Sequence, residues 1–265
     1  MRRVIILLIL FLTLTSWKAD TSGPWIITKG ERIILYSRPL GYSKAESPDS
    51  IAIQTIIQEQ EQVIDYINER LNTNFDSNVK IFLFNQDEAK EKIGTNGGGF
   101  ASLSKSKKHI YFTFHSRPFL NTVLNKYDYL GVHEMVHIIT ISQIGNLRTR
   151  FFGEGYSNAI DGNYGGENVN GVLTRRRNDS TLITIIKNDK LLKPSELLYN
   201  DAISESLYYP QIGCLINWMF KEYGVAKINL LYGLKRDKIE AEFLKVTGVT
   251  FKDMENEYME YLKNK

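Results

Sequence analysis

The sequence has 265 residues, of which 43% are hydrophobic and 24% are charged, and its formal net charge is +3. This composition is ordinary for a globular protein with a substantial core. The small net charge gives no reason to expect a nucleic-acid partner. The single cysteine, Cys214, excludes an internal disulfide and is expected to be a packing residue.

The N-terminal residues have the pattern of a targeting segment. A short basic start, Met1 to Arg3, precedes the apolar residues 4–14. This pattern is typical of a secretory signal peptide, and the apolar run is shorter than the roughly 20 residues of a membrane span. We expect residues 1–20 to be a signal peptide, with an uncleaved anchor as the alternative. The protein would then be exported across the cytoplasmic membrane of a bacterium, and would meet a membrane only through this segment.

The next hundred or so residues predict an α/β lobe. Residues 31–36 and 79–84 have the composition of strands. Residues 50–71 place apolar side chains at helical spacing, with Ser50 as the predicted N-cap. Residues 87–93 predict a short helix that ends at Gly94.

A glycine-rich stretch follows and predicts one strand of a hairpin. Residues 97–102 and 109–114 are separated by a polar turn, residues 104–108. Glycines in a strand permit the close approach of another backbone. His109 and His115 flank the second strand and are expected to be surface residues rather than catalytic ones.

The strongest chemical signal is the pattern H-E-x-x-H at residues 133–137, inside an apolar, helix-compatible run. On a helix, His133 and His137 lie one turn apart on one face, where two imidazoles can share a metal ion. Glu134 is rotated by about 100° from His133 and so lies beside the metal, as a general base for water would. The alternative is a pair of hydrogen-bonded core histidines. However, burying two imidazoles and a carboxylate without partners is costly, and only four histidines occur in the chain.

A third ligand is available on the following segment. Glu154 comes after a turn that contains Gly145 and Asn146. A second helix can therefore fold back and direct Glu154 at the two histidines, completing the three-ligand set of a catalytic zinc site. Asn158, one turn further on, is a candidate to orient a metal-bound histidine. Taken alone, Glu154 could equally be a solvated carboxylate near a helix start.

The remaining chain is predicted to be mainly helical. Residues 161–177 are rich in Gly and Asn and are expected to be a surface loop that includes the arginines 175–177. Residues 207–224 predict a buried helix that ends at Gly224.

The sequence HEMVH followed by FGEGYSN resembles the gluzincin zinc metallopeptidases of the peptidase MA-like superfamily. The resemblance implies one Zn²⁺ per chain, bound by His133, His137 and Glu154, with Glu134 as catalytic base. It implies that Gly98, Gly99, Phe100 and Ala101 belong to an edge strand that binds an extended peptide. It also makes Tyr209 a candidate donor to the oxyanion, although many of the 15 tyrosines could be structural instead.

The aminopeptidases of this superfamily carry an acidic residue near the edge strand that binds the substrate's free amine. No Asp or Glu lies between Asn96 and Phe114, which favours cleavage inside a peptide. We therefore expect an endopeptidase acting on peptide or protein substrates. The alternatives are a metal-dependent hydrolase of non-peptide substrates and a zincin-fold binding protein without turnover.

The expected fold is α+β and zincin-like. It would have an N-terminal mixed β-sheet with helices and a mainly helical C-terminal lobe. The expected boundaries are 24–126 for the α/β lobe with the cleft strand and 127–265 for the lobe that carries the zinc site.

Overall fold

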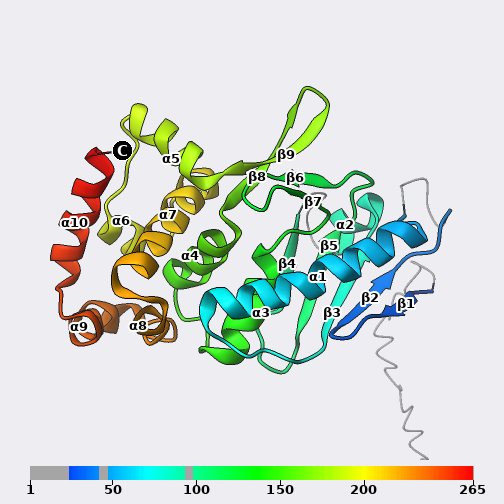
Figure 1. The fold of residues 1–265 in the computed structure, drawn as a ribbon, viewed down its shortest axis with the longest axis horizontal. Coiled ribbons are helices and arrows are strands. Elements are labelled where there is room, and N and C mark those ends of the chain that lie inside the picture. The colour runs from blue at the N-terminus through cyan, green and yellow to red at the C-terminus, as the bar shows by residue number, and fades with distance from the viewer. Residues whose placement is uncertain (1–23, 42–46, 93–97, 265) are drawn as a thin grey trace, which may run out of the picture.

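The computed structural model describes residues 24–41, 47–92 and 98–264 (Figure 1). The predicted signal segment, residues 1–20, lies outside these residues, as do Gly94, Asn96 and Gly97. Among the helices described, none combines the length and apolar character needed to cross a bilayer.

The N-terminal strands form a five-stranded mixed sheet in the order β1-β2-β3-β5-β4. Strands β2, β3 and β5 are parallel to one another, whereas β1 and β4 are antiparallel strands at the two edges. The predicted strand at residues 79–84 and the predicted hairpin are confirmed, and the first predicted strand lies at residues 33–37. The strands are β1 (Ile26–Lys29), β2 (Ile33–Ser37), β3 (Val79–Phe84), β4 (Gly99–Ala101) and β5 (His109–Thr113).

One face of this sheet is covered by α1 (Ser50–Leu71), which crosses the strands in Figure 1. The predicted helix is confirmed because its apolar stripe, including Ile56 and Ile64, is buried against the sheet. The N-cap is Asp49 rather than Ser50. The Asp49 carboxylate accepts a 2.7 Å hydrogen bond from the backbone of Ala52, so Ser50 is already the first helical residue.

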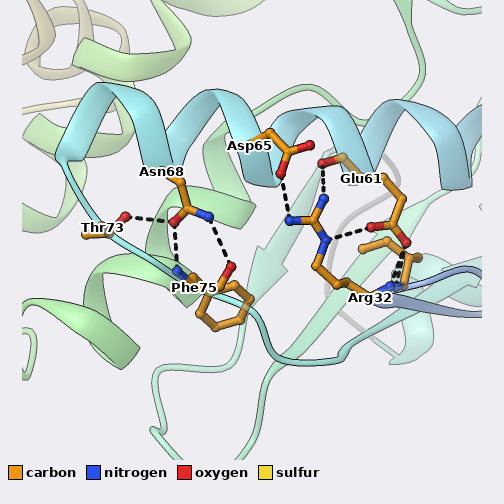
Figure 2. Close-up of polar contacts among 7 residues, drawn as sticks. Arg32, Glu61, Asp65, Asn68, Thr73 and Phe75 are labelled. Carbon is orange, nitrogen blue, oxygen red and sulfur yellow. Dashed lines mark hydrogen bonds and ion pairs between the residues drawn. The ribbon is translucent and has the colours of Figure 1, made fainter.

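Polar side chains attach the middle and the C-terminal end of α1 to neighbouring segments (Figure 2). In the middle, Arg32, just before β2, donates to Glu61 at 2.9 Å and to Asp65 at 2.7 Å. Near the C-terminal end, the Asn68 side-chain oxygen accepts from the Phe75 backbone at 2.9 Å, and its amide donates to the Phe75 carbonyl at 3.0 Å. These contacts fix the direction in which the chain leaves α1 toward β3.

A second sheet combines strands from distant parts of the chain, in the order β7-β6-β9-β8. Its strands are β6 (Phe119–Asn121), β7 (Lys126–Asp128), β8 (Asn163–Val169) and β9 (Val172–Arg177). The prediction of a loop at residues 161–177 is therefore wrong. Strand β9 pairs in parallel with β6, and Arg175 binds Asp128 on β7 at 2.8 Å. The sheet thus joins segments from both sides of the predicted boundary at residue 126.

The C-terminal part of the chain is mainly helical and lies beside the sheets (Figure 1). Helix α4 packs closely on α7, because a side chain at Gly155 would meet Ile216 at 2.6 Å. Helices and two mixed sheets together make an α+β architecture. The predicted helix at residues 207–224 is confirmed by α7. The helices are α2 (Gln86–Lys92), α3 (His133–Gln143), α4 (Arg150–Asp161), α5 (Asn178–Lys187), α6 (Pro194–Tyr199), α7 (Glu205–Tyr223), α8 (Val225–Asn229), α9 (Arg236–Thr247) and α10 (Phe251–Lys263).

Side chains of α1 also hold the turn that precedes α3. The Gln60 amide donates to the Gly131 carbonyl at 3.0 Å, and Glu59 accepts from the Tyr129 backbone at 3.1 Å. Gly131 has a φ of 74°, which disfavours any residue with a side chain. Helix α3 therefore begins at His133 rather than earlier in the apolar run.

Candidate metal centre

Three side chains from two neighbouring helices converge on one point. Helix α3 supplies His133 and His137, and α4 supplies Glu154. The distances are 3.3 Å from His133 Nε2 to Glu154 Oε2 and 3.6 Å from His137 Nε2 to Glu154 Oε1. One candidate ligand atom from each residue lies within 4.8 Å of the others. The structure thus brings together the three residues that the sequence predicted as ligands.

The turn between α3 and α4 sets the position of Glu154. Thr149 caps α4 by accepting from the Phe152 backbone at 3.3 Å. Gly153 packs on Leu147, where a Cβ atom would meet the leucine at 2.4 Å. Glu154 follows immediately and faces α3.

The spacing of these atoms fits a tetrahedral zinc ion. Two atoms each bound at about 2.1 Å to one zinc ion at the tetrahedral angle lie roughly 3.4 Å apart. The distances are 3.3 Å from His133 to Glu154 Oε2 and 3.6 Å from His137 to Glu154 Oε1, so each imidazole lies at about this distance from a different oxygen of the carboxylate. Two imidazole nitrogens and one carboxylate oxygen are also the donor types that zinc prefers.

Unpaired polar atoms at this site are a second indication of a ligand. Glu154 Oε2 and His137 Nδ1 are both buried without a hydrogen-bond partner. Leaving a buried polar atom unpaired costs about 1–3 kcal/mol. A cation held between the three side chains would remove this cost for the carboxylate oxygen, so the donor set fits a metal.

The histidines and carboxylates at the centre shift one another's pKa values. Burial lowers the pKa of His133, but Glu154, Glu134 and Asp161 raise it, and the result is about 9. Burial alone would raise the pKa of Glu154, but the two histidines have the larger combined effect and lower it from 4.5 to about 2. Burial and the neighbouring His133 lower the pKa of His137. These shifts favour an ion pair between protonated His133 and ionised Glu154 when no metal is bound.

The centre opens into a cleft of about 560 Å³. Glu134 lines this cleft beside the three candidate ligands, as the sequence predicted for a general base. The cleft is also lined by the predicted substrate-binding residues of the edge strand, Gly98, Gly99, Phe100 and Ala101.

Asn158 lines the cleft but forms no hydrogen bond with either histidine. Its side-chain amide donates to the Glu154 carbonyl one turn earlier, at 2.8 Å. Its side-chain oxygen is buried without a partner. The contact that the structure gives it supports the α4 backbone under Glu154, and not the orientation of a histidine ring.

Tyr209 reaches the cleft from α7. Its ring centroid is 6.1 Å from that of His133, and its hydroxyl donates to Glu205 at 3.4 Å. Burial raises the pKa of Tyr209 well above its ordinary value, so the phenol keeps its proton. Tyr164 of β8 packs edge-on against Tyr209, with ring centroids 5.5 Å apart.

The residues of the cleft that the sequence analysis missed include four with ionisable side chains, Asp161, Tyr164, Arg175 and Glu205. Asp161 is 5% exposed and lies seven residues after Glu154 on α4, so its helical spacing could have indicated it. Tyr164 and Arg175 could not be placed while their segment was predicted to be a loop. The other two histidines take no part, since His109 contacts the Tyr111 hydroxyl at 3.2 Å and His115 packs on Phe119.

Comparisons of the sequence with models of protein families and with curated proteins gave no match.

Proposed function

We propose that this protein is a zinc-dependent metallopeptidase of the gluzincin type. The observation that carries the proposal is the set of two imidazoles and one carboxylate close enough to share one ion, with Glu134 in the same cleft. His133, His137 and Glu154 would hold the ion. When bound, zinc supplies a Lewis acid that lowers the pKa of water to about 7 and polarises a carbonyl group.

Glu134 acts as the proton carrier in this proposal. Its carboxylate accepts a proton from the attacking water and delivers it to the amide nitrogen of the leaving group. The Tyr209 phenol lines the same cleft and, in this proposal, leaves its 3.4 Å hydrogen bond to Glu205 and donates instead to the oxygen that gains negative charge. Both roles require only side chains that line the cleft.

The edge strand supports a peptide as the substrate. Strand β4 is the last strand of its sheet within the described part of the chain, so strand pairing leaves one of its edges unused. An extended peptide can bind there by strand addition, with its backbone beside the zinc ligands. The unpaired edge of β4 therefore favours a peptidase over a hydrolase of non-peptide substrates.

Cleavage inside peptides remains the preferred mode. The edge strand carries no carboxylate to bind a free amine, although Glu205 at the start of α7 does line the cleft. Peptides with acetylated N-termini should therefore be cleaved as well as free ones. If cleavage requires a free amine, the endopeptidase assignment is wrong, and Glu205 becomes the candidate amine ligand.

The decisive experiment is Glu134→Gln, measured against cleavage of a proteome-derived peptide library. The amide cannot accept a proton, so turnover should fall by about 100-fold or more, while zinc content by metal analysis stays near one per chain. The exposed Glu222→Gln is the matched control and should keep wild-type turnover. Unchanged turnover in Glu134→Gln would contradict the mechanism. If the zinc-loaded protein cleaves esters but no peptide, it is a hydrolase of non-peptide substrates. If it cleaves neither, it is a binding protein without turnover.

A further inference from the structure

Four aromatic side chains form a continuous row across the first sheet. Tyr36 of β2 lies directly opposite Phe82 of β3, which lies opposite Tyr111 of β5, which lies opposite Phe100 of β4. Along the row, successive ring centroids are 4.4 Å, 5.2 Å and 4.8 Å apart, and the interplanar angles are 17°, 16° and 23°. The rings therefore stack at about the spacing of neighbouring strands, roughly 4.8 Å.

The row lies on the face of the sheet that α1 does not cover. The residues on either side of Phe100, Gly99 and Ala101, point to the opposite face, where Ala101 joins the core. A Cβ atom at Gly99 would meet the Phe112 ring at 2.4 Å. Strand β4 is thus small on its core side and aromatic on its outer side.

The two ends of the row differ. At one end, Tyr36 is followed by Ile27 of β1, its partner in the next strand. At the other end, Phe100 is 42% exposed and lies on the edge strand that lines the metal cleft. One face of its ring stacks on Tyr111, and the next position along the row is where a strand added to β4 would place a side chain.

We infer that Phe100 sets the substrate preference: an extended peptide added to β4 places one side chain directly opposite Phe100, and the site favours an aromatic ring there. This inference rests on the proposed peptidase function. In a sheet, directly opposite side chains share a face and touch. An aromatic substrate residue would continue the stack as its fifth ring, whereas the substrate residues on either side of it would face the small side of β4.

The stacking geometry makes the preference aromatic rather than simply apolar. An aliphatic side chain opposite Phe100 would bury similar area without the added attraction between stacked rings. That attraction corresponds to about a 2- to 10-fold difference in affinity. The preference should therefore be moderate and confined to one position relative to the cleaved bond.

The test is cleavage-site profiling of the zinc-loaded protein with a proteome-derived peptide library. We expect aromatic residues to be enriched at one fixed position, and Phe100→Leu to reduce this enrichment by about 2- to 10-fold while other positions keep theirs. Tyr36→Leu removes a ring from the closed end of the same row. It is the matched control, and the enrichment should survive in it.

Cleavage without any aromatic enrichment, or with enrichment that Phe100→Leu leaves intact, would overturn the inference and leave the proposed function standing. A second measurement does not depend on turnover. Zinc-loaded Glu134→Gln should bind short blocked peptides about 2- to 10-fold more tightly when Phe replaces Ala at one position. If the wild type cleaves no peptide and this binding preference is also absent, both the function and the inference fail. If only the binding preference is found, the proposed function fails and Phe100 selects a bound peptide rather than a substrate.

Discussion

Two clusters of charged side chains in this protein each contain a pair that is largely shielded from water, but the clusters differ in their hydrogen bonding. The first cluster also contains Asp65, whose side chain is 67% exposed. The exposed fractions are 14% and 18% for Arg32 and Glu61, and 22% and 20% for His133 and Glu154. In the first cluster, the three guanidinium nitrogens of Arg32 find oxygen acceptors on α1 at 2.7 to 3.1 Å (Figure 2). In the second, Glu154 Oε2 and His137 Nδ1 have no hydrogen-bond partner, although Glu154 Oε2 lies 3.3 Å from His133 Nε2.

The difference distinguishes a structural cluster from the proposed metal site. A buried cluster whose donors and acceptors are all paired contributes to the stability of the fold. A buried cluster with aligned but unpaired atoms costs free energy until a ligand binds. The first cluster should therefore respond to substitution in stability, and the second in metal content and turnover.

The largest expected effect is that of His137→Ala at the second cluster. Loss of one of three ligands should reduce zinc affinity by more than the roughly 10- to 100-fold that loss of a supporting hydrogen bond costs, and turnover should disappear with the metal. Metal analysis after dialysis and peptide cleavage measure the two effects. If the variant keeps one zinc ion per chain, the second cluster is not the metal site and the proposed difference between the clusters is wrong.

A smaller effect is expected from Glu61→Ala at the first cluster. The Glu61 carboxylate accepts from the Arg32 side chain and from the backbone of both Arg32 and Ile33. Its loss leaves these donors unpaired and should lower the free energy of unfolding by about 1–3 kcal/mol in urea titration. The exposed Glu69→Ala on the same helix is the control. Zinc content of the folded fraction should not change, and a loss of zinc would show that the clusters are not independent.

The smallest effect is a pH dependence of stability in metal-free protein. Because the folded pKa of His133 is raised from 6.5 to about 9, its contribution is complete below pH 6.5 and is lost as the pH rises through about 9. The folded pKa of Glu154 is lowered from 4.5 to about 2, so its contribution is present above pH 4.5 and is lost as the pH falls toward 2.

Thermal melts in a chelator should therefore show falling stability between pH 6.5 and 9. Zinc should suppress this fall, because the ion takes the place of the His133 proton. Identical alkaline profiles with and without zinc would argue against a metal at this site.

Elements with a strong local pattern could be predicted from the sequence. Helix α1 was found because its apolar residues recur at helical spacing, and the candidate ligands were found because the spacing of His133 and His137 and the turn before Glu154 are properties of short segments. The N-cap was misplaced by one residue because Asp49 and Ser50 are both good capping residues, and only the geometry selects between them.

Features that depend on distant pairing could not be predicted. Strands β8 and β9 contain Gly165, Gly166 and three arginines, and they lack the alternation of a half-buried strand. They belong to the second sheet because β9 pairs in parallel with β6 and because Arg175 forms an ion pair with Asp128. The aromatic row was missed for the same reason. Its members are dispersed along the chain, and their alignment follows from strand register alone.

The contact between Gln60 and the Gly131 carbonyl has a consequence for shortened forms of the protein. The turn before α3 is held by a side chain of α1, some seventy residues earlier in the sequence, whereas all three candidate ligands lie after that turn. A fragment that began after α1 would contain every candidate ligand but would lack the side chain that holds this turn, so we do not expect it to form the centre on its own.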